Sequence, residues 1–451
     1  MAISPRRRLT QALITSLLVT FLAWAGVWAV RTWRASADAG EAQALTSIST
    51  SRALGYVQAG LRWRPDEADL WRQRADLASF AVPRVARAYA RRAVELNPRA
   101  WRAWRTLGLL DFQLGDSAAS RRDLVQASRY DHGFASHFAL GNLALAQGNE
   151  SEFLKEMTAA LAISPLDMVY YALHQIVSHS DPSPAELAAT LPASRADVIA
   201  RGIEIFLTSG KFAAAIASWR RLHCQSYQYP DCREAALALT NGLAAAAFAS
   251  QFASPRVKPP SRPDAELPSA PHMIASAMAA WNQAVHAGIL SQAPVAAGSV
   301  SDGYFQHSWV GPAFSWQSAR VLPLTAVTGF AQHGNAVRFP FNGYQPDDAP
   351  LLKEFVPVAP GASYSISYQS RRQIAGSETG LELRVLATPE RQLASIPAAL
   401  YANWSLNSAT ILVPESVHLI QLVFAYARPN GQVRLHDPVL VAGVQMQQLF
   451  R

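Results

Sequence analysis

Histidine and carboxylate side chains could in principle do acid–base chemistry or bind a metal, but their spacing here supports neither. His132 and His137 are five residues apart, and so are His174 and His179. On a helix this spacing places two side chains on different faces, which does not suit one metal ion. We interpret both pairs as ordinary surface or interface histidines.

Acidic residues cluster at Asp347, Asp348 and Glu354. A glycosidase needs two carboxylates held across a cleft at a set separation, and adjacency in sequence does not provide that. We therefore interpret this cluster as a solvated loop. The sequence also has no Walker loop, no Gly-x-Gly-x-x-Gly after a strand, no His-Glu-x-x-His and no Gly-x-Ser-x-Gly. We expect a protein that is not an enzyme and needs no catalytic cofactor.

The N-terminus predicts a membrane anchor over residues 1–34. Arg6–Arg8 precede 22 uncharged, mostly apolar residues, Leu9–Val30, which are followed by Arg31 and Arg34. About 20 apolar residues span a bilayer, whereas a signal peptide has a shorter apolar core. Small-x-small sites at residues 23–25 and 35–37 leave cleavage open as an alternative. The positive-inside rule places the first arginines in the cytoplasm and the rest of the chain outside it.

The two cysteines, Cys224 and Cys232, would close a loop of nine residues. Outside the cytoplasm such a loop readily forms a disulfide, whereas in a cytosolic chain free thiols would be expected. The chain-entropy treatment assigns this bridge roughly 2.5 kcal/mol of stability. Zinc sites use other spacings and further ligands, so we predict a local disulfide.

A repeat signal governs the first half of the chain. Positions that close helical hairpins recur at intervals of 33, 34 and 33 residues: Pro65, Pro98, His132 and Pro165. Five residues before each of them stands a small residue, at Gly60, Ala93, Ala127 and Ala160. Small side chains there let two helices approach closely. A hairpin of this length must stack on its neighbours, which predicts an α-solenoid.

The large and small residues within these units resemble the tetratricopeptide family over roughly residues 50–167. The most complete units carry Trp104, Leu107, Gly108 and Leu124, and then Leu140, Gly141, Met157 and Ala160. The first unit reads as half a repeat, from about Ala53 to Arg64. We assign residues 35–179 to the repeats and residues 180–253 to further helical hairpins. An unrelated helical bundle is the alternative.

The second half of the chain has the pattern of a different, all-β domain. A proline-rich linker and a short helix are expected over residues 254–298. From residue 299 to 451, glycine and proline separate short alternating strands such as 363–368, 381–385, 419–426 and 433–441. The fold class is therefore multidomain α + β, with an α-solenoid followed by a β-sandwich, and 451 residues suffice for two or three domains.

This region resembles the jelly-roll carbohydrate-binding modules of the galactose-binding-like type. The matching segments are residues 302–305, 314–316, 358–361 with Tyr364, 380–381, Trp404, 413–414 and 436–438. The resemblance implies the fold more strongly than it implies sugar binding. Asp302 and Asp437 lie near the first and last strands and could ligate a structural calcium together with backbone carbonyls, as related modules often do.

Aromatic side chains in or near the loops of the sandwich are candidates for stacking on a sugar ring. They are Trp309, Trp316, Tyr344 and Trp404. Packing in the core is the alternative for each of them. It applies most to Trp316 and Trp404, because the family pattern tends to bury these two.

Charge suggests the kind of partner. The formal net charge is +8, and arginine clearly outnumbers the acidic residues between Arg52 and Tyr130. Such a surface suits an acidic polysaccharide, anionic lipid headgroups or an acidic protein; arginine that only solvates the outer faces is the alternative. No nucleic-acid motif accompanies it, so nucleic acid is not expected. Exposed arginines on the first helix of each hairpin would face a partner, which nominates Arg72, Arg102 and Arg105.

The order of domains is similar to that of membrane-anchored repeat proteins of bacterial exopolysaccharide assembly. We expect a single-pass protein of the bacterial inner membrane, with most of the chain in the periplasm. It would scaffold an envelope complex that assembles or exports polysaccharide. The alternatives are a glycan-binding receptor that acts through the jelly roll, and a polysaccharide-modifying enzyme with an unrecognised site.

Overall fold

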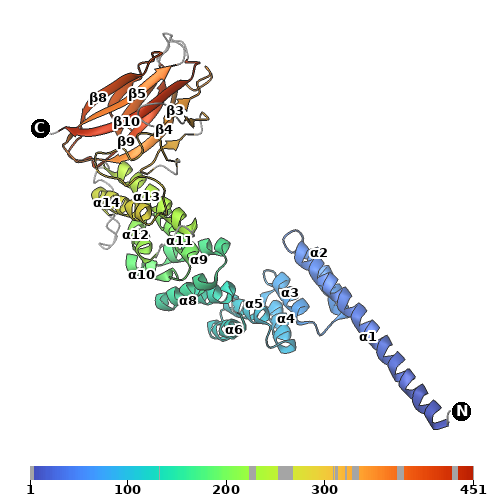
Figure 1. The fold of residues 1–451 in the computed structure, drawn as a ribbon. Helices are drawn as coiled ribbons and strands as arrows, with labels where there is room; N and C mark the ends of the chain where they lie inside the picture. The colour runs from blue at the N-terminus through green and yellow to red at the C-terminus, as the bar shows by residue number, and fades with distance from the viewer. Residues whose placement is uncertain are drawn as a thin grey trace. The chain divides into compact units, whose positions relative to one another are not determined.

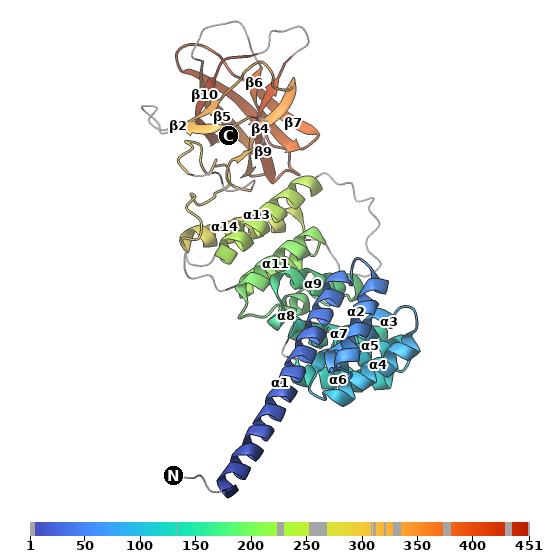
Figure 2. The same ribbon diagram turned by 90° about the vertical axis from the view of Figure 1, so that its right-hand side faces the viewer.

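The chain forms two compact units, residues 1–168 and residues 169–451, in a computed structural model (Figures 1 and 2). The structure describes residues 5–131, 133–222, 230–251, 268–307, 309, 313–319, 322–327, 335–372, 380–428 and 435–449. Helices make up the first unit. The second unit combines helices with two β-sheets, so the expected fold class of hairpin repeats followed by a β-sandwich is confirmed.

The first unit is a row of antiparallel helical hairpins. Their helices are α1 (Pro5–Leu45), α2 (Thr50–Trp63), α3 (Ala68–Ala78), α4 (Pro83–Leu96), α5 (Trp101–Gln113), α6 (Ser117–Tyr130), α7 (Phe134–Ala146) and α8 (Glu150–Ile163). Each odd-numbered helix packs on the next even-numbered one. The odd-numbered helices α3, α5 and α7 also contact one another in turn. Since closely spaced helices lie on the inside of a curved stack, these helices line the concave side.

Close helix packing explains the small residues of the repeat. A Cβ atom at Gly108 would lie 2.8 Å from Leu124 Cγ, and one at Gly141 would lie 2.9 Å from Met157 Cε. Ala93, Ala127 and Ala160 are fully buried. The loops also repeat, because the indole N–H of Trp71 donates to the carbonyl of Pro65 at 2.7 Å, and Trp104 does the same to Pro98 at 2.8 Å. His132, the third hairpin-closing position, lies outside the described residues.

The first repeat is complete rather than half a repeat, because α1 supplies its inner helix. The helix does not stop at residue 34 but continues without a break to Leu45. Its last turns bury Ala35 and Ala42 against Val57 and Leu61 of α2. The expected anchor and the first repeat therefore share one helix.

The second unit begins with further helices. They are α9 (Leu166–His179, which starts just before the boundary), α10 (Pro184–Thr190), α11 (Ala196–Thr208), α12 (Phe212–Arg221), α13 (Pro230–Ser250) and α14 (Ala270–His286). Most of the expected proline-rich linker falls outside the described residues. The short helix predicted after it is α14.

Two antiparallel five-stranded sheets face each other in the sandwich. Sheet A has the order β1-β4-β9-β6-β7 and sheet B the order β2-β3-β10-β5-β8. The strands are β1 (Gln317–Ser318), β2 (Thr325–Val327), β3 (Ala336–Phe339), β4 (Asp348–Pro357), β5 (Ser363–Arg372), β6 (Leu381–Thr388), β7 (Arg391–Pro397), β8 (Ser405–Leu412), β9 (Leu419–Ala427) and β10 (Val439–Leu449). Alternation works as expected in β5, where Tyr364, Ile366 and Tyr368 enter the core. The last strand begins at Val439, later than the predicted residue 433.

Helix α13 docks directly on the sandwich, so residues 180–253 and 299–451, which we expected to form separate domains, belong to one compact unit. The two parts lie against each other in both views (Figures 1 and 2). Phe248 meets Phe355 of β4 with ring centroids 5.2 Å apart. The side-chain oxygen of Asn241 accepts a hydrogen bond from the backbone N–H of Ala313 at 2.8 Å.

Candidate functional site

An apolar cavity of about 340 Å3 opens on the concave side of the repeats. Helices α5 and α7 form most of its wall, and α6 closes its base. Its lining is Arg105, Leu109, Phe112, Ser120, Leu124, Phe134, Ala135, Phe138, Ala139, Asn142, Leu143 and Met168. Leu109 and Phe112 are exposed although they are large and apolar, which is unusual unless something covers them.

Arg105 lines this cavity, whereas Arg102 lines a separate recess together with Glu67 and Asp69. The guanidinium groups of Arg102 and Arg105 stack on the Trp101 ring, at 5.1 and 5.2 Å from its centroid. In the part of the chain that the structure describes, neither has a carboxylate within 4 Å. Burial lowers the pKa of Arg105, so its positive charge is incompletely solvated. A carboxylate brought to this position would gain a charge-assisted hydrogen bond.

Arg72, the third nominated arginine, is placed differently. Its side chain is only 15% exposed, and it donates to Asp69 at 2.7 Å and to Asp76 at 2.5 Å. Asp76 in turn accepts a hydrogen bond from Thr106 of the next inner helix at 2.8 Å. Arg72 therefore ties two repeats together. Of the three side chains expected to be exposed, Arg102 is exposed and Arg105 is half-buried.

A second surface with recognition chemistry is the outer face of sheet B. Opposite the core residues of β5, the outward positions are Ser363, Ser365 and Ser367. Ser365 and Ser367 pair across the sheet with polar residues of the neighbouring strands: Ser408 and Thr410 of β8, and Gln445 and Gln447 of β10. Ser363 pairs instead with two exposed leucines, Leu412 and Leu449. Hydroxyl and amide groups in parallel rows can bind the hydroxyls of a sugar.

Trp404 belongs to this outer face rather than to the core. It packs on Ala336, Leu440 and Ala442, which form a cluster separate from the core of the sandwich. The expectation that the family pattern buries it does not hold, because its ring is only partly buried. Trp316 is fully buried, as expected, and donates its indole N–H to the carbonyl of Asp302 at 3.0 Å. Trp309 packs against the same core, whereas Tyr344 is 87% exposed.

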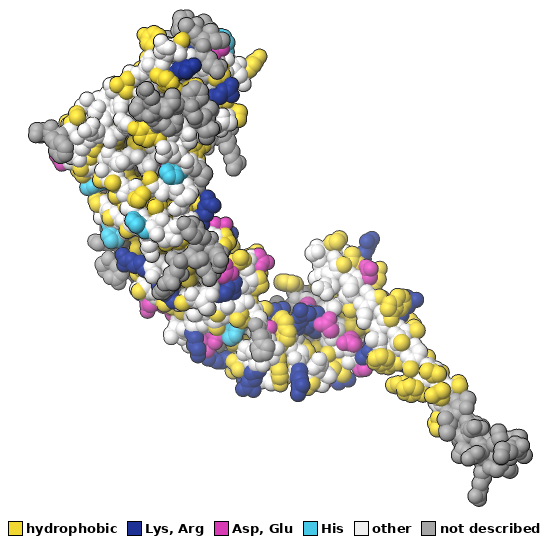
Figure 3. Space-filling view, in the orientation of Figure 1, with side chains coloured by type: hydrophobic (Ala, Val, Ile, Leu, Met, Phe, Trp, Pro, Cys, Tyr) yellow, Lys and Arg dark blue, Asp and Glu magenta, His cyan; other side chains and the backbone are white. Residues whose placement is uncertain are grey.

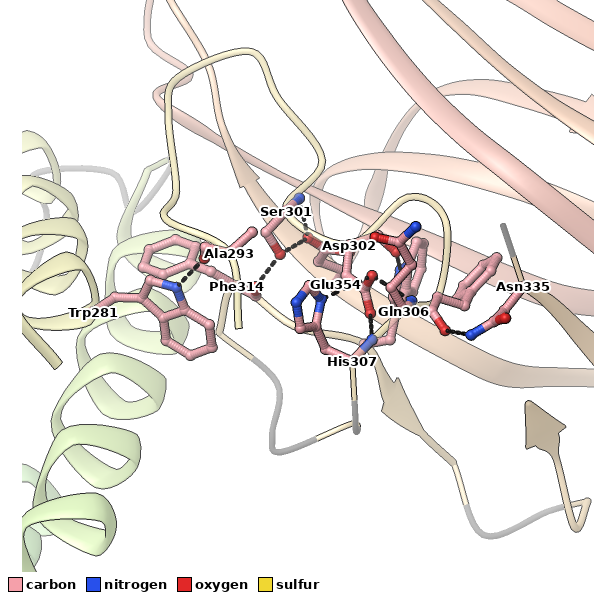
Figure 4. Close-up of polar contacts among 11 residues, drawn as sticks. Trp281, Ala293, Ser301, Asp302, Gln306, His307, Phe314, Asn335 and Glu354 are labelled. Atoms are coloured by element: carbon pink, nitrogen blue, oxygen red, sulfur yellow. Dashed lines mark hydrogen bonds and ion pairs between the residues drawn. The ribbon is translucent and has the colours of Figure 1, made fainter. Parts of the chain in front are cut away.

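The carboxylate cluster that we interpreted as a solvated loop includes a buried residue, so that interpretation is wrong for Glu354. It lies inside β4, and its Oε1 atom accepts hydrogen bonds from the backbone N–H and the hydroxyl of Ser301 at 3.0 and 2.8 Å (Figure 4). Burial raises its pKa from 4.5 to about 7. Asp347 and Asp348 instead pair with Arg428 and Arg384, each at 2.9 Å.

This region contains residue types typical of hydrolases, but their contacts are structural. The Ser301 hydroxyl also contacts the carbonyl of Phe314. Asp302 accepts backbone hydrogen bonds from Gln306 at 2.8 Å and His307 at 3.1 Å, which holds the loop before β1 (Figure 4). Ser301 and Asp302 thus satisfy neighbouring backbone groups instead of forming a nucleophile and a base.

The two proposed calcium ligands are engaged in different contacts. Asp302 holds its own loop, whereas Asp437 accepts a hydrogen bond from Arg372 at 2.5 Å. Among the residues that the structure describes, no group of three His, Cys, Asp or Glu side chains could hold a metal ion. The calcium site thus remains a sequence-based prediction.

The remaining candidates are histidines and cysteines. His137 belongs to α7 and faces α8. Its Nδ1 atom is 2.8 Å from Glu156 Oε2 of α8, and this hydrogen bond raises the pKa of the imidazole. His174 and His179 are exposed on α9, as expected of surface residues. Cys232 is buried in α13, but Cys224 lies outside the described residues, so the disulfide also remains a prediction.

No family model and no curated protein matches the chain, but parts of it are similar to solved structures. PilF of Pseudomonas aeruginosa is 15% identical over 42% of this chain and 90% of its own length, with a TM-score of 0.30. PilW, a widely conserved type IV pilus biogenesis factor, is 17% identical over 46% of this chain and 86% of its own, with a TM-score of 0.29. A CBM4 structure is 11% identical over 34% of this chain and all of its own length, with a TM-score of 0.26.

Proposed function

We propose that this protein is a membrane-anchored scaffold that acts by binding, and that the concave cavity of its repeats holds a segment of a partner protein. The partner would belong to an envelope complex that assembles or exports polysaccharide. The observation that carries this proposal is the apolar cavity lined by Arg105, which stacks with Arg102 on the Trp101 ring and forms no ion pair within 4 Å in the described structure.

The anchor is α1. From Ser16 the helix is long and apolar enough to cross a membrane. Its large side chains are exposed all around the helix between Leu17 and Trp33, and they stand out in yellow in Figure 3. Such a surface is stable in hydrocarbon and not in water. Together with Arg6–Arg8 on the cytoplasmic side, this supports a single-pass protein of the bacterial inner membrane with its repeats and sandwich in the periplasm.

The cavity suits a peptide with one large apolar side chain next to an acidic group. Its volume and its Leu and Phe lining would accept a Leu or Phe side chain, whose burial contributes roughly 1.5–3 kcal/mol. A carboxylate beside it would reach Arg105, whose planar guanidinium binds carboxylates through two parallel hydrogen bonds. A neutral polysaccharide offers neither feature, so a protein segment fits this groove better.

Photo-crosslinking in cells tests the scaffold. A crosslinking amino acid at Leu109, in the cavity, should capture a partner, whereas one at Val125, which is also exposed but lies on the outer helix α6, should not. Arg102→Glu with Arg105→Glu should reduce the yield at Leu109, more at low salt than at high salt, because screening removes part of the attraction. Polysaccharide export should fall in parallel. No adduct from Leu109, together with normal export by the double variant, would reject the proposal.

A glycan receptor is the second candidate, and one observation favours it. Trp404 stands on the outer face of sheet B beside rows of Ser, Thr and Gln, which is the combination of ring and hydroxyl partners that sugar binding uses. Calorimetry of the full chain against the envelope polysaccharide should then show binding that Trp404→Ala abolishes. Arg105→Glu should leave that binding unchanged, which separates the two functions.

A further inference from the structure

The end of α2 returns to the level at which α1 would leave the membrane. Arg64 caps α2, and its Nη1 atom donates to the hydroxyl of Thr32 in α1 at 3.3 Å. A helix rises 1.5 Å per residue, so Arg62 and Trp63 lie within about 3 Å of that level along the axis of α2. Arg31, Trp33 and Arg34 of α1 lie at about the same level. We call these five residues the interfacial collar.

The collar has positive charge and indole rings that the protein does not cover. Arg64 is neutralised by Asp66 at 3.0 Å and Glu67 at 3.4 Å. Within the described residues, by contrast, Arg31, Arg34 and Arg62 form no ion pair, and all three are exposed. Trp33 and Trp63 are 65% and 41% exposed, and the Arg34 guanidinium lies 5.6 Å from the Trp33 ring centroid.

Close packing of α1 and α2 fixes the positions of the collar residues in the absence of any ligand. Gly60 lets α2 approach α1, because a Cβ atom there would lie 3.4 Å from Asp38 Cβ and 3.0 Å from Leu70 Cδ1. Ala35 and Ala42 of α1 are buried in the same contact. Residues about 30 positions apart in sequence are therefore held together at one end of the first hairpin.

We propose that the interfacial collar binds the anionic phospholipid headgroups of the leaflet from which α1 emerges. Guanidinium groups bind phosphate through two parallel hydrogen bonds, and tryptophan prefers the boundary between hydrocarbon and water. Lipid is the expected occupant because the collar begins where the apolar surface of α1 ends. This inference rests on the proposed function, in which α1 crosses the bilayer. It adds a second contact, from α2, that fixes how the repeats stand on the membrane.

Depth measurements on the full chain test the contact. A bimane probe at Trp63→Cys, in vesicles of phosphatidylcholine and phosphatidylglycerol, should be quenched by brominated lipids. The matched control is Tyr56→Cys, a 38% exposed position seven residues earlier on the same helix and about 10 Å further along it, which should not be quenched. Carbonate washing of the same vesicles reports separately on the anchor.

Native mass spectrometry of the detergent-purified full chain tests the choice of headgroup. The wild type should retain phosphatidylglycerol over phosphatidylcholine, and Arg31→Gln, Arg34→Gln and Arg62→Gln together should abolish that preference. Arg84, Arg91 and Arg122 are exposed arginines on α4 and α6, and their replacement by Gln should leave the preference for phosphatidylglycerol unchanged. An unquenched probe at position 63 in a carbonate-resistant protein would overturn the collar and leave the anchor intact. Equal retention of both lipids would also overturn the collar. Loss of the protein on washing would overturn both.

Discussion

Gln251 and Leu419 are joined by two hydrogen bonds, although 168 residues separate them. The side-chain oxygen of Gln251 accepts from the backbone N–H of Leu419, and its amide nitrogen donates to the carbonyl of the same residue, both at 2.9 Å. The same amide also bonds the N–H of His418 at 2.7 Å and the carbonyl of Ala387 at 3.1 Å. One side chain at the end of α13 thus satisfies backbone groups of β6, β9 and the loop before β9.

Gln251→Leu should destabilise the second unit by about 1–3 kcal/mol, because it leaves backbone groups of the sandwich without partners. Denaturant unfolding followed by tryptophan fluorescence would measure the loss. Gln392→Leu, at an exposed position of β7, serves as the control and should change the midpoint little. Equal midpoints for both variants would mean that the docking of α13 does not depend on this amide.

Ala127→Leu and Ala93→Leu should each destabilise the repeats by about 1–3 kcal/mol, since both residues are fully buried where two helices meet. The exposed Ala118 of α6 provides the control, and Ala118→Leu should be close to neutral. Thermal unfolding followed by far-ultraviolet circular dichroism would compare the three variants. If the buried and exposed changes had the same effect, the repeat register would be incorrect.

Glu354 predicts a pH dependence of the second unit. Burial raises its pKa from 4.5 to about 7 in the folded state, so the folded state binds this proton more tightly than the unfolded state does. The contribution of Glu354 to the stability of the second unit should therefore be greatest below pH 4.5. It should fall as the pH rises from 4.5 towards 7 and stay constant above pH 7. The full difference is about 3 kcal/mol, at about 1.4 kcal/mol per pKa unit.

The variant Glu354→Gln should remove this dependence, because the amide is neutral at every pH. Melting temperatures between pH 5 and pH 8 would give the slope. Glu390→Gln, at an exposed turn, should keep the slope of the wild type. A wild-type slope in the Glu354 variant would show that another group is responsible.

A disulfide between Cys224 and Cys232 should leave no free thiol in protein that is denatured without reductant. Alkylation followed by mass spectrometry would count the thiols. Cys224→Ser should cost roughly 2.5 kcal/mol, from the entropy that loop closure removes from the unfolded chain. The loss should vanish when wild type and variant are compared under reducing conditions. Two alkylated cysteines in the wild type would rule the bridge out.

The repeats were predictable because their signals are local and periodic. A hairpin-closing position every 33 or 34 residues, a proline in three of the four cases, and a small residue five positions earlier define each hairpin. Gly108 and Gly141 have the close neighbours that this pattern requires. Strand β5 was equally predictable, because the side chains on one of its faces are buried in the core and alternate with the partly exposed ones.

Other features depend on contacts that leave no such pattern. Glu354 reads as part of an acidic loop, but it lies in β4, on the opposite face from Phe355, and its hydrogen-bond partner Ser301 stands 53 residues earlier in the chain. Gln251 is a single polar residue before a proline-rich run, and nothing near it in sequence predicts its hydrogen bonds to Leu419. The concave cavity combines residues of two hairpins and Met168 of the following helix α9, so spacing alone could not reveal it.

The uninterrupted course of α1 also constrains how the protein can be cut or recombined. A soluble fragment starting at residue 46 would lack the surface that covers Val57, Leu61 and Leu70, and would expose the core of the first hairpin. A fragment starting at residue 35 would keep that surface and lose only the apolar part of the helix. The proposed anchor is thus not an interchangeable module. Any substitute from another protein would have to end at residue 34, in helical phase with the turns of α1 that bury Ala35 and Ala42.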